Sequence, residues 1–186
     1  MSFRSTLFGM LIALLAGALQ PVWAAAKSPN QETTINAFTV WTASGNIQET
    51  AKDHAKFEGT LGGHVYVDTD QGPVHAGFIS CPVTLEINVA DKSQQGAGKC
   101  TITADDGAQV SGDLKCAGLF LIGCAGDFKF TGGTGRFEGV AGSGPVVLRS
   151  NTRIFIEKTN GTVDAKAEGI MFWRRLHYTL ARKATP

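Results

Sequence analysis

Short stretches in which apolar and polar residues alternate recur roughly every ten residues along most of the chain. The clearest is Val83–Val89, which is apolar at every odd position, and Cys100–Ala104 alternates in the same way. A period of two places successive side chains on opposite faces of a β-strand. Asp106-Gly107 and Asn160-Gly161 are dipeptides that supply the positive φ angles of tight hairpin turns. The pattern therefore predicts an all-β domain of antiparallel strands joined by short hairpins.

Glycine is frequent, at 23 of 186 residues, and many glycines lie where strands would bend or bulge. Bends of this kind curl a sheet until its two edges meet, and closure removes exposed strand edges. We predict a single antiparallel β-barrel, with a β-sandwich as the alternative. The predicted strands include 153–158, 162–168 and a last strand over 170–180. The apolar face of that last strand would carry Ile170, Phe172, Leu176, Tyr178 and Leu180.

The first 26 residues resemble a cleavable secretory signal peptide. Arg4 precedes an uncharged apolar run over 7–19, which is shorter than the ~20 residues of a membrane-spanning helix. Small residues at 24–26 allow cleavage after Ala24 or after Ala26, and both sites stay open. A retained N-terminal anchor is the disfavoured alternative. We expect a secreted or periplasmic protein, with a flexible segment over 27–33, a barrel domain over 34–186 and no membrane contact after cleavage.

Removal of residues 1–26 leaves 160 residues with 16 Lys and Arg against 16 Asp and Glu, because Arg4 is the one charge lost. Nucleic-acid-binding proteins usually carry a basic excess that displaces counterions from phosphates. The neutral balance argues against nucleic acid as a partner.

The four cysteines all follow the leader. An even number in an exported chain predicts two disulfides. We favour Cys116–Cys124, since residues 117–123 would form a hairpin end, and this leaves Cys81–Cys100; the other two pairings remain open. No C-x₂₋₄-C spacing occurs, so a zinc site is disfavoured and no metal is predicted.

The most distinctive segment is the glycine-rich run over 132–144. It lacks the Gly-Lys-Ser/Thr ending of a phosphate-binding loop, and its glycine spacing does not match the dinucleotide fingerprint. We therefore predict a structural role, in which glycines bend one strand into the next and an aromatic ring turns inward. The residues concerned are Gly132, Gly133, Gly135, Phe137 and Gly139.

The longer run over 128–144 resembles the signature of allene oxide cyclase-like and dirigent-like barrel proteins. That resemblance implies a barrel of about eight antiparallel strands, trimeric assembly and action without a cofactor. In that group, plant allene oxide cyclases close a fatty-acid epoxide, and dirigent proteins hold phenoxy radicals for stereospecific coupling. The paired cysteines and the bacterial-style leader depart from the plant cyclases, and no catalytic residue carries over.

Two sets of side chains are candidates for ligand binding. His64, Tyr66 and Asp68 alternate along one predicted strand face, where they could line a cavity with an acid/base group beside a carboxylate. The alternative, which we favour, is that the intervening valines form the core and this polar face meets water.

Trp173, Arg175 and His177 would share one face of the last strand and could line a pocket for an amphipathic or anionic ligand. An outer face covered by a neighbouring subunit is the equal alternative.

Three alternative functions are compatible with this sequence. The first is non-catalytic binding of a small apolar or amphipathic molecule in the barrel, because small barrels commonly enclose one ligand. The second is a cofactor-free isomerase or cyclase that holds its substrate in a reactive shape. The third is a structural or interaction protein with a solid barrel core. The sequence favours a non-enzymatic role over catalysis.

The cysteine prediction can be checked by mass mapping of the exported protein. We expect every cysteine in a disulfide-linked peptide, because the compartment outside the cytosol is oxidising. Four free thiols would contradict the prediction.

Overall fold

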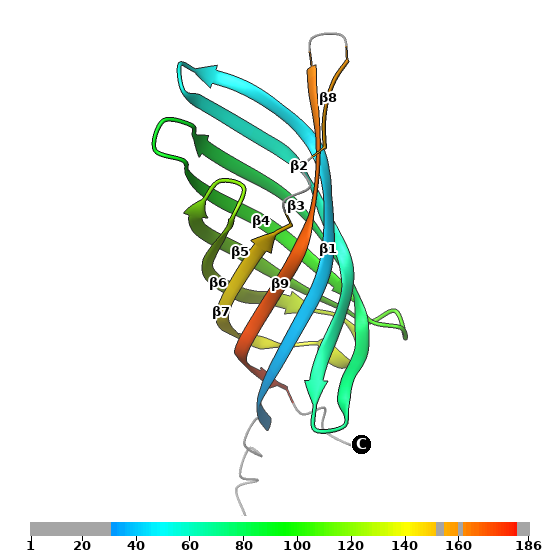
Figure 1. Ribbon diagram of the computed structural model, residues 1–186. Helices are drawn as coiled ribbons and strands as arrows, with labels where there is room; N and C mark the ends of the chain where they lie inside the picture. Colours follow the sequence, from blue (N-terminus) through cyan, green and yellow to red (C-terminus); the bar gives the residue numbers. More distant parts are fainter. Residues whose placement is uncertain (1–30, 152–154, 160–161, 182–186) are drawn as a thin grey trace, which may run out of the picture.

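The computed structural model describes residues 31–151, 155–159 and 162–181, and long antiparallel strands wrap into a barrel (Figure 1). The predicted signal peptide and the Asn160-Gly161 turn lie outside the described residues. The strands are β1 (Gln31–Ala51), β2 (His54–Thr69), β3 (Gly72–Asn88), β4 (Ser93–Thr103), β5 (Gln109–Leu119), β6 (Gly123–Gly133), β7 (Ala141–Ser150), β8 (Phe155–Thr159) and β9 (Thr162–Leu180), with a single 3₁₀ turn, η1 (Gly135–Phe137), between β6 and β7.

Strand pairing closes the sheet. Strands β1 to β7 pair in sequence order, β7 pairs with β9, and β9 pairs back with β1, all antiparallel. Strand β8 pairs with β9 and extends beyond the rim as one arm of a hairpin (Figure 1). The result is a closed eight-stranded barrel, which confirms the predicted barrel over the sandwich. Strand β1 begins at Gln31, earlier than the predicted domain boundary at residue 34.

The last two predicted strands are one continuous strand, β9, which bulges at Arg174 and Arg175. The pairing with β1 skips from Ala37↔Trp173 to Ile35↔Leu176, so β9 carries an extra residue there. Arg175 has a φ of 56°, and its backbone N–H donates to the side-chain oxygen of Asn36 at 2.9 Å.

This bulge shifts the inward positions of β9. Met171, Trp173 and Leu176 are buried in the core, which places Ile170 and Phe172 on the outer wall. The predicted apolar face of Ile170, Phe172 and Leu176 is therefore wrong, because a single bulge changes the face on which every later residue lies.

One half of the barrel interior is packed solid. Its largest fully buried side chains are Trp173, Phe128, Ile79, Met171 and Val146. The rings of Phe128 and Trp173 meet edge to face at a centroid distance of 5.8 Å. Gly112 lies directly beneath the Phe128 ring, where a Cβ would collide with it. Glycine at an inward position thus makes room for an aromatic ring across the strand pair.

Both disulfides lie inside the barrel and join neighbouring strands. Cys81 of β3 is bonded to Cys100 of β4, and Cys116 of β5 is bonded to Cys124 of β6, with Cα–Cα distances of 4.1 and 5.5 Å. These are the two pairs that the sequence favours. All four cysteines face inward and are buried.

The glycine-rich segment forms η1 and the turn that leads into β7. Gly135 and Gly139 have φ angles of 61° and 74°, which glycine adopts without a steric penalty. The Phe137 ring is half-buried beneath the guanidinium of Arg136, 4.9 Å from its centroid, and Arg136 also pairs with Asp106 at 3.1 Å. Phe137 is outside both hydrophobic core clusters of the described residues, so it supports the barrel end and not the core predicted for it.

Removal of each disulfide tests its contribution to stability. We expect Cys81→Ala with Cys100→Ala to lower the free energy of unfolding by about 3 kcal/mol, and Cys116→Ala with Cys124→Ala by about 2.5 kcal/mol, because the second pair closes the shorter loop. Urea unfolding of the oxidised protein and both double variants measures the difference. A larger loss from the second pair would contradict this order.

Candidate functional site

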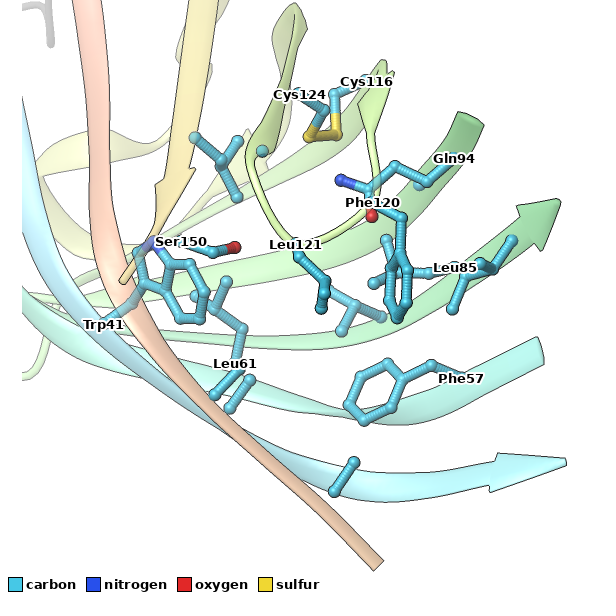
Figure 2. A pocket seen from close by; sticks show the side chains of 18 of the residues that line it. Trp41, Phe57, Leu61, Leu85, Gln94, Cys116, Phe120, Leu121, Cys124 and Ser150 are labelled. Carbon is cyan, nitrogen blue, oxygen red and sulfur yellow. A yellow bond between two sulfur atoms is a disulfide. The ribbon is translucent and has the colours of Figure 1, made fainter. Parts of the chain in front are cut away.

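An apolar cavity opens at the end of the barrel that is formed by the β1–β2, β3–β4 and β5–β6 turns, and this end is called the mouth below. The cavity has a volume of about 100 Å³. Aromatic and aliphatic side chains line it, with a disulfide on one side (Figure 2). Prominent among them are Trp41, Phe57, Leu61, Leu85, Phe120 and Leu121.

The cavity exists because inward positions near the mouth carry small residues. Ala43 of β1, Gly96 of β4, and Ala165 and Ala167 of β9 all line it. In the packed half, the corresponding inward positions of β9 carry Met171 and Trp173. Eight strands enclose an interior that side chains can just fill, so small residues at several levels leave space for one small molecule.

The β5–β6 turn contributes one wall of the cavity. Phe120 and Leu121 line it, and Leu121 adopts a positive φ of 67°. The backbone N–H of Phe120 donates to the carbonyl of Lys92 at 2.8 Å, which ties this turn to the β3–β4 turn. The Cys116–Cys124 disulfide joins the two strands just below. Covalent and hydrogen-bonded ties therefore hold this wall in place.

Gln94 is the principal polar group in the cavity. Its side chain is 7% exposed and extends into the space between Cys116 and Phe120 (Figure 2). Its amide is not among the fully buried, unpartnered polar atoms of the described residues, so water reaches it through the open mouth. Trp41 also lines the cavity, and its buried indole N–H has no partner among the described residues.

The start of β4, which carries Gln94, is fixed by Asp91. The backbone N–H of Ser93 donates to the Asp91 carboxylate at 2.8 Å. Hydrogen bonds from the Ser93 side chain and backbone hold the pKa of Asp91 below its usual value. The Asp91 carboxylate is therefore ionised at neutral pH, and in this form it accepts the hydrogen bond that holds the β3–β4 turn.

His64 and Tyr66 lie on the outer wall of the barrel, away from the cavity. The His64 and His75 rings approach to 3.0 Å between nitrogens, and His75 contacts Asp105 at 3.3 Å. Tyr66 stacks on Phe38 with centroids 5.4 Å apart. Val65 is buried in the core, as the favoured alternative predicts.

Trp173, Arg175 and His177 do not share a face. Trp173 is 1% exposed and belongs to the packed half, whereas Arg175 and His177 are exposed. The His177 ring contacts the hydroxyl of Thr34 at 2.7 Å. The bulge at Arg175 separates them, because the extra residue turns the strand between Trp173 and His177. The predicted common pocket is wrong.

Sequence reasoning did not single out the residues that line the cavity. Alternation in Cys100–Ala104 places Cys100 inward, and the same period carried back along β4 places Gly98, Gly96 and Gln94 inward as well. The alternation along β4 is therefore a local signal that places Gln94 in the barrel interior. The convergence of Trp41, Phe57 and Phe120 depends on strand register and could not be obtained from local patterns.

The described residues of this chain occupy the ranges 31–151, 155–159 and 162–181. No cluster of three or more His, Cys, Asp or Glu in these ranges could hold a metal ion. No helix in the same ranges is long and apolar enough to cross a membrane.

Comparison with known proteins yields structural matches alone. No family model matches the chain, and no curated protein matches its sequence. Among solved structures, one described as the pterocarpan synthase dirigent protein GePTS1 aligns over 78% of this chain and 93% of that chain, with a TM-score of 0.36 and 12% identity. The assignment of a closed barrel therefore rests on the strand pairing itself.

Substitution of Trp173 distinguishes a core residue from a ligand-binding one. We expect Trp173→Ala to lower the free energy of unfolding by about 3–5 kcal/mol, because it leaves a cavity in the packed half. His177→Ala, on the exposed side of the same strand, should change it by less than about 0.5 kcal/mol. Urea unfolding measures both, and equal midpoints for the two variants would contradict the placement of Trp173.

Proposed function

We propose that this protein binds a small apolar or amphipathic molecule in the mouth of its barrel. The observation that carries the proposal is the open apolar cavity lined by Trp41, Phe57 and Phe120. Ligand sites are typically concave, mostly apolar and largely preformed, with a few polar groups that fix orientation. This cavity has each of those properties.

The size of the cavity limits what can enter. A dry apolar cavity of about 150 Å³ in another protein binds benzene, and this one measures about 100 Å³ with an open side. A single ring or a short chain would fill it, and a larger body such as a naphthalene would project in part through the open mouth. Each Å² of apolar surface removed from water contributes about 25 cal/mol.

The division of the interior supports binding over a purely structural role. The packed half already supplies a core with Phe128, Trp173 and Met171 fully buried. A barrel that served as a solid scaffold would continue this packing to both ends. Here small residues such as Ala43 and Ala165 leave apolar surface uncovered. This surface and the shape of the cavity are sufficient to bind a small apolar molecule.

We further propose that the protein acts outside the cytosol. The two disulfides are consistent with an oxidising compartment, because such bonds persist in exported proteins. The signal-peptide sequence at residues 1–26 supports the same location. Trimeric assembly, which the family resemblance implies, stays a prediction.

Filling the cavity tests the proposed function. We expect Ala43→Phe to reduce the affinity for 1-ethylnaphthalene at least tenfold, because the added ring occupies the space between β2 and β9. Ala117→Phe is the matched control, since Ala117 is exposed on the outer wall of β5. Fluorescence titration gives the affinities, and urea unfolding confirms that both variants fold. Unchanged binding by Ala43→Phe would contradict binding in the mouth.

A further inference from the structure

We infer that the molecule bound in the mouth is uncharged and carries one hydroxyl or carbonyl group, which the side-chain amide of Gln94 recognises. This inference rests on the proposed function and specifies the class of ligand. It assigns Gln94 as the residue that orients the ligand and selects it over a plain hydrocarbon.

The unusual feature is an amide side chain that lies in an apolar cavity and has no protein partner. Among the described residues, Thr39 and Gln94 are the buried polar side chains, and the Thr39 hydroxyl donates to the carbonyl of Val40 at 3.4 Å. The Gln94 side chain makes no hydrogen bond to another described residue. The fully buried side-chain polar atoms without a partner in the described residues are the indole nitrogens of Trp41 and Trp173, so the Gln94 amide is still reached by water through the open mouth. A ligand oxygen that pairs with the amide would replace this water in surroundings where a hydrogen bond is stronger than in bulk water.

The surroundings of Gln94 aim its amide at the ligand. Gly96, the next inward residue of β4, adds no side chain beside it, and a Cβ there would crowd Leu85. Figure 2 shows the amide extending into the cavity from the strand, beside the Cys116–Cys124 disulfide. The Asp91 carboxylate holds the backbone N–H of the preceding Ser93. The amide is thus carried on a fixed strand end.

The chemistry of the amide defines the matching group. Its NH₂ donates and its carbonyl accepts, so a ligand hydroxyl pairs with either half and a ligand carbonyl pairs with the NH₂. A carboxylate would lose its hydration without an opposite charge in the interior, which is costly. Lys166 is the charged residue among the lining side chains, and it is exposed at the rim. The site therefore favours an uncharged oxygen group.

The experiment compares two nearly isosteric probes, 1-naphthalenemethanol and 1-ethylnaphthalene, in which a hydroxyl replaces a methyl group. We expect the full protein to bind the alcohol about two- to tenfold more tightly, because its hydroxyl gains a hydrogen bond that the methyl group cannot make. Gln94→Leu should abolish that preference and retain binding of the hydrocarbon. Gln95→Leu is the matched control, since Gln95 is exposed on the same strand and should keep the preference.

The outcomes separate this inference from the proposed function. Hydrocarbon binding that Ala43→Phe weakens, combined with an alcohol preference that survives Gln94→Leu, would overturn the inference and leave the proposed function standing. Tighter binding of 1-naphthoate than of the alcohol would overturn the uncharged class. If no probe binds the unmodified protein, both fail.

A measurement without ligand adds an independent arm. Gln94→Leu should unfold at the same or a higher urea concentration than the unmodified protein, because it removes an amide with no protein partner and adds apolar surface to an apolar cavity. A clear loss of stability would show that the amide serves the fold and would overturn its assignment to the ligand.

Discussion

The pairing of β1 with β9 is the interaction on which the rest of the structure depends. These two strands are the ends of the described barrel, and their ladder closes the sheet so that neither keeps an open edge. Trp41 of β1 lies against Gly169 of β9, and Ala37 of β1 pairs with Trp173. Opening this seam would expose both tryptophans to water. The packed half and the cavity exist because the seam is closed.

Within the closed barrel, the size of the inward residues decides what each half does. Large side chains meet from opposite walls in the packed half, and there Phe128 uses the space above Gly112. Near the mouth, alanine and glycine take the inward positions, and the same strands cannot meet across the axis. The two disulfides follow this division: Cys81–Cys100 lies in the core, and Cys116–Cys124 borders the cavity.

The polar side chains of the barrel also differ in their environment between the outer wall and the mouth. On the outer wall, His64, His75 and Asp105 contact one another in solvent, where such contacts contribute little to stability. Inside the mouth, the Gln94 amide is surrounded by apolar surface, where a hydrogen bond is electrostatically stronger than in bulk water. The polar side chain that lies inside the mouth is therefore neutral.

The sequence by itself determined the all-β class, and it favoured the barrel, the observed cysteine pairs and an inward Val65, because alternation and turn residues are local properties. Tertiary structure alone decided the site. The bulge at Arg174 and Arg175 reverses the faces of β9 after Trp173, so that Leu176 is inward and His177 is outward, and no local pattern at 170–180 predicts it. The cavity arises from the register between strands that are distant in the sequence, which brings Gln94 beside Phe120. This register cannot be predicted from the pattern within any one strand.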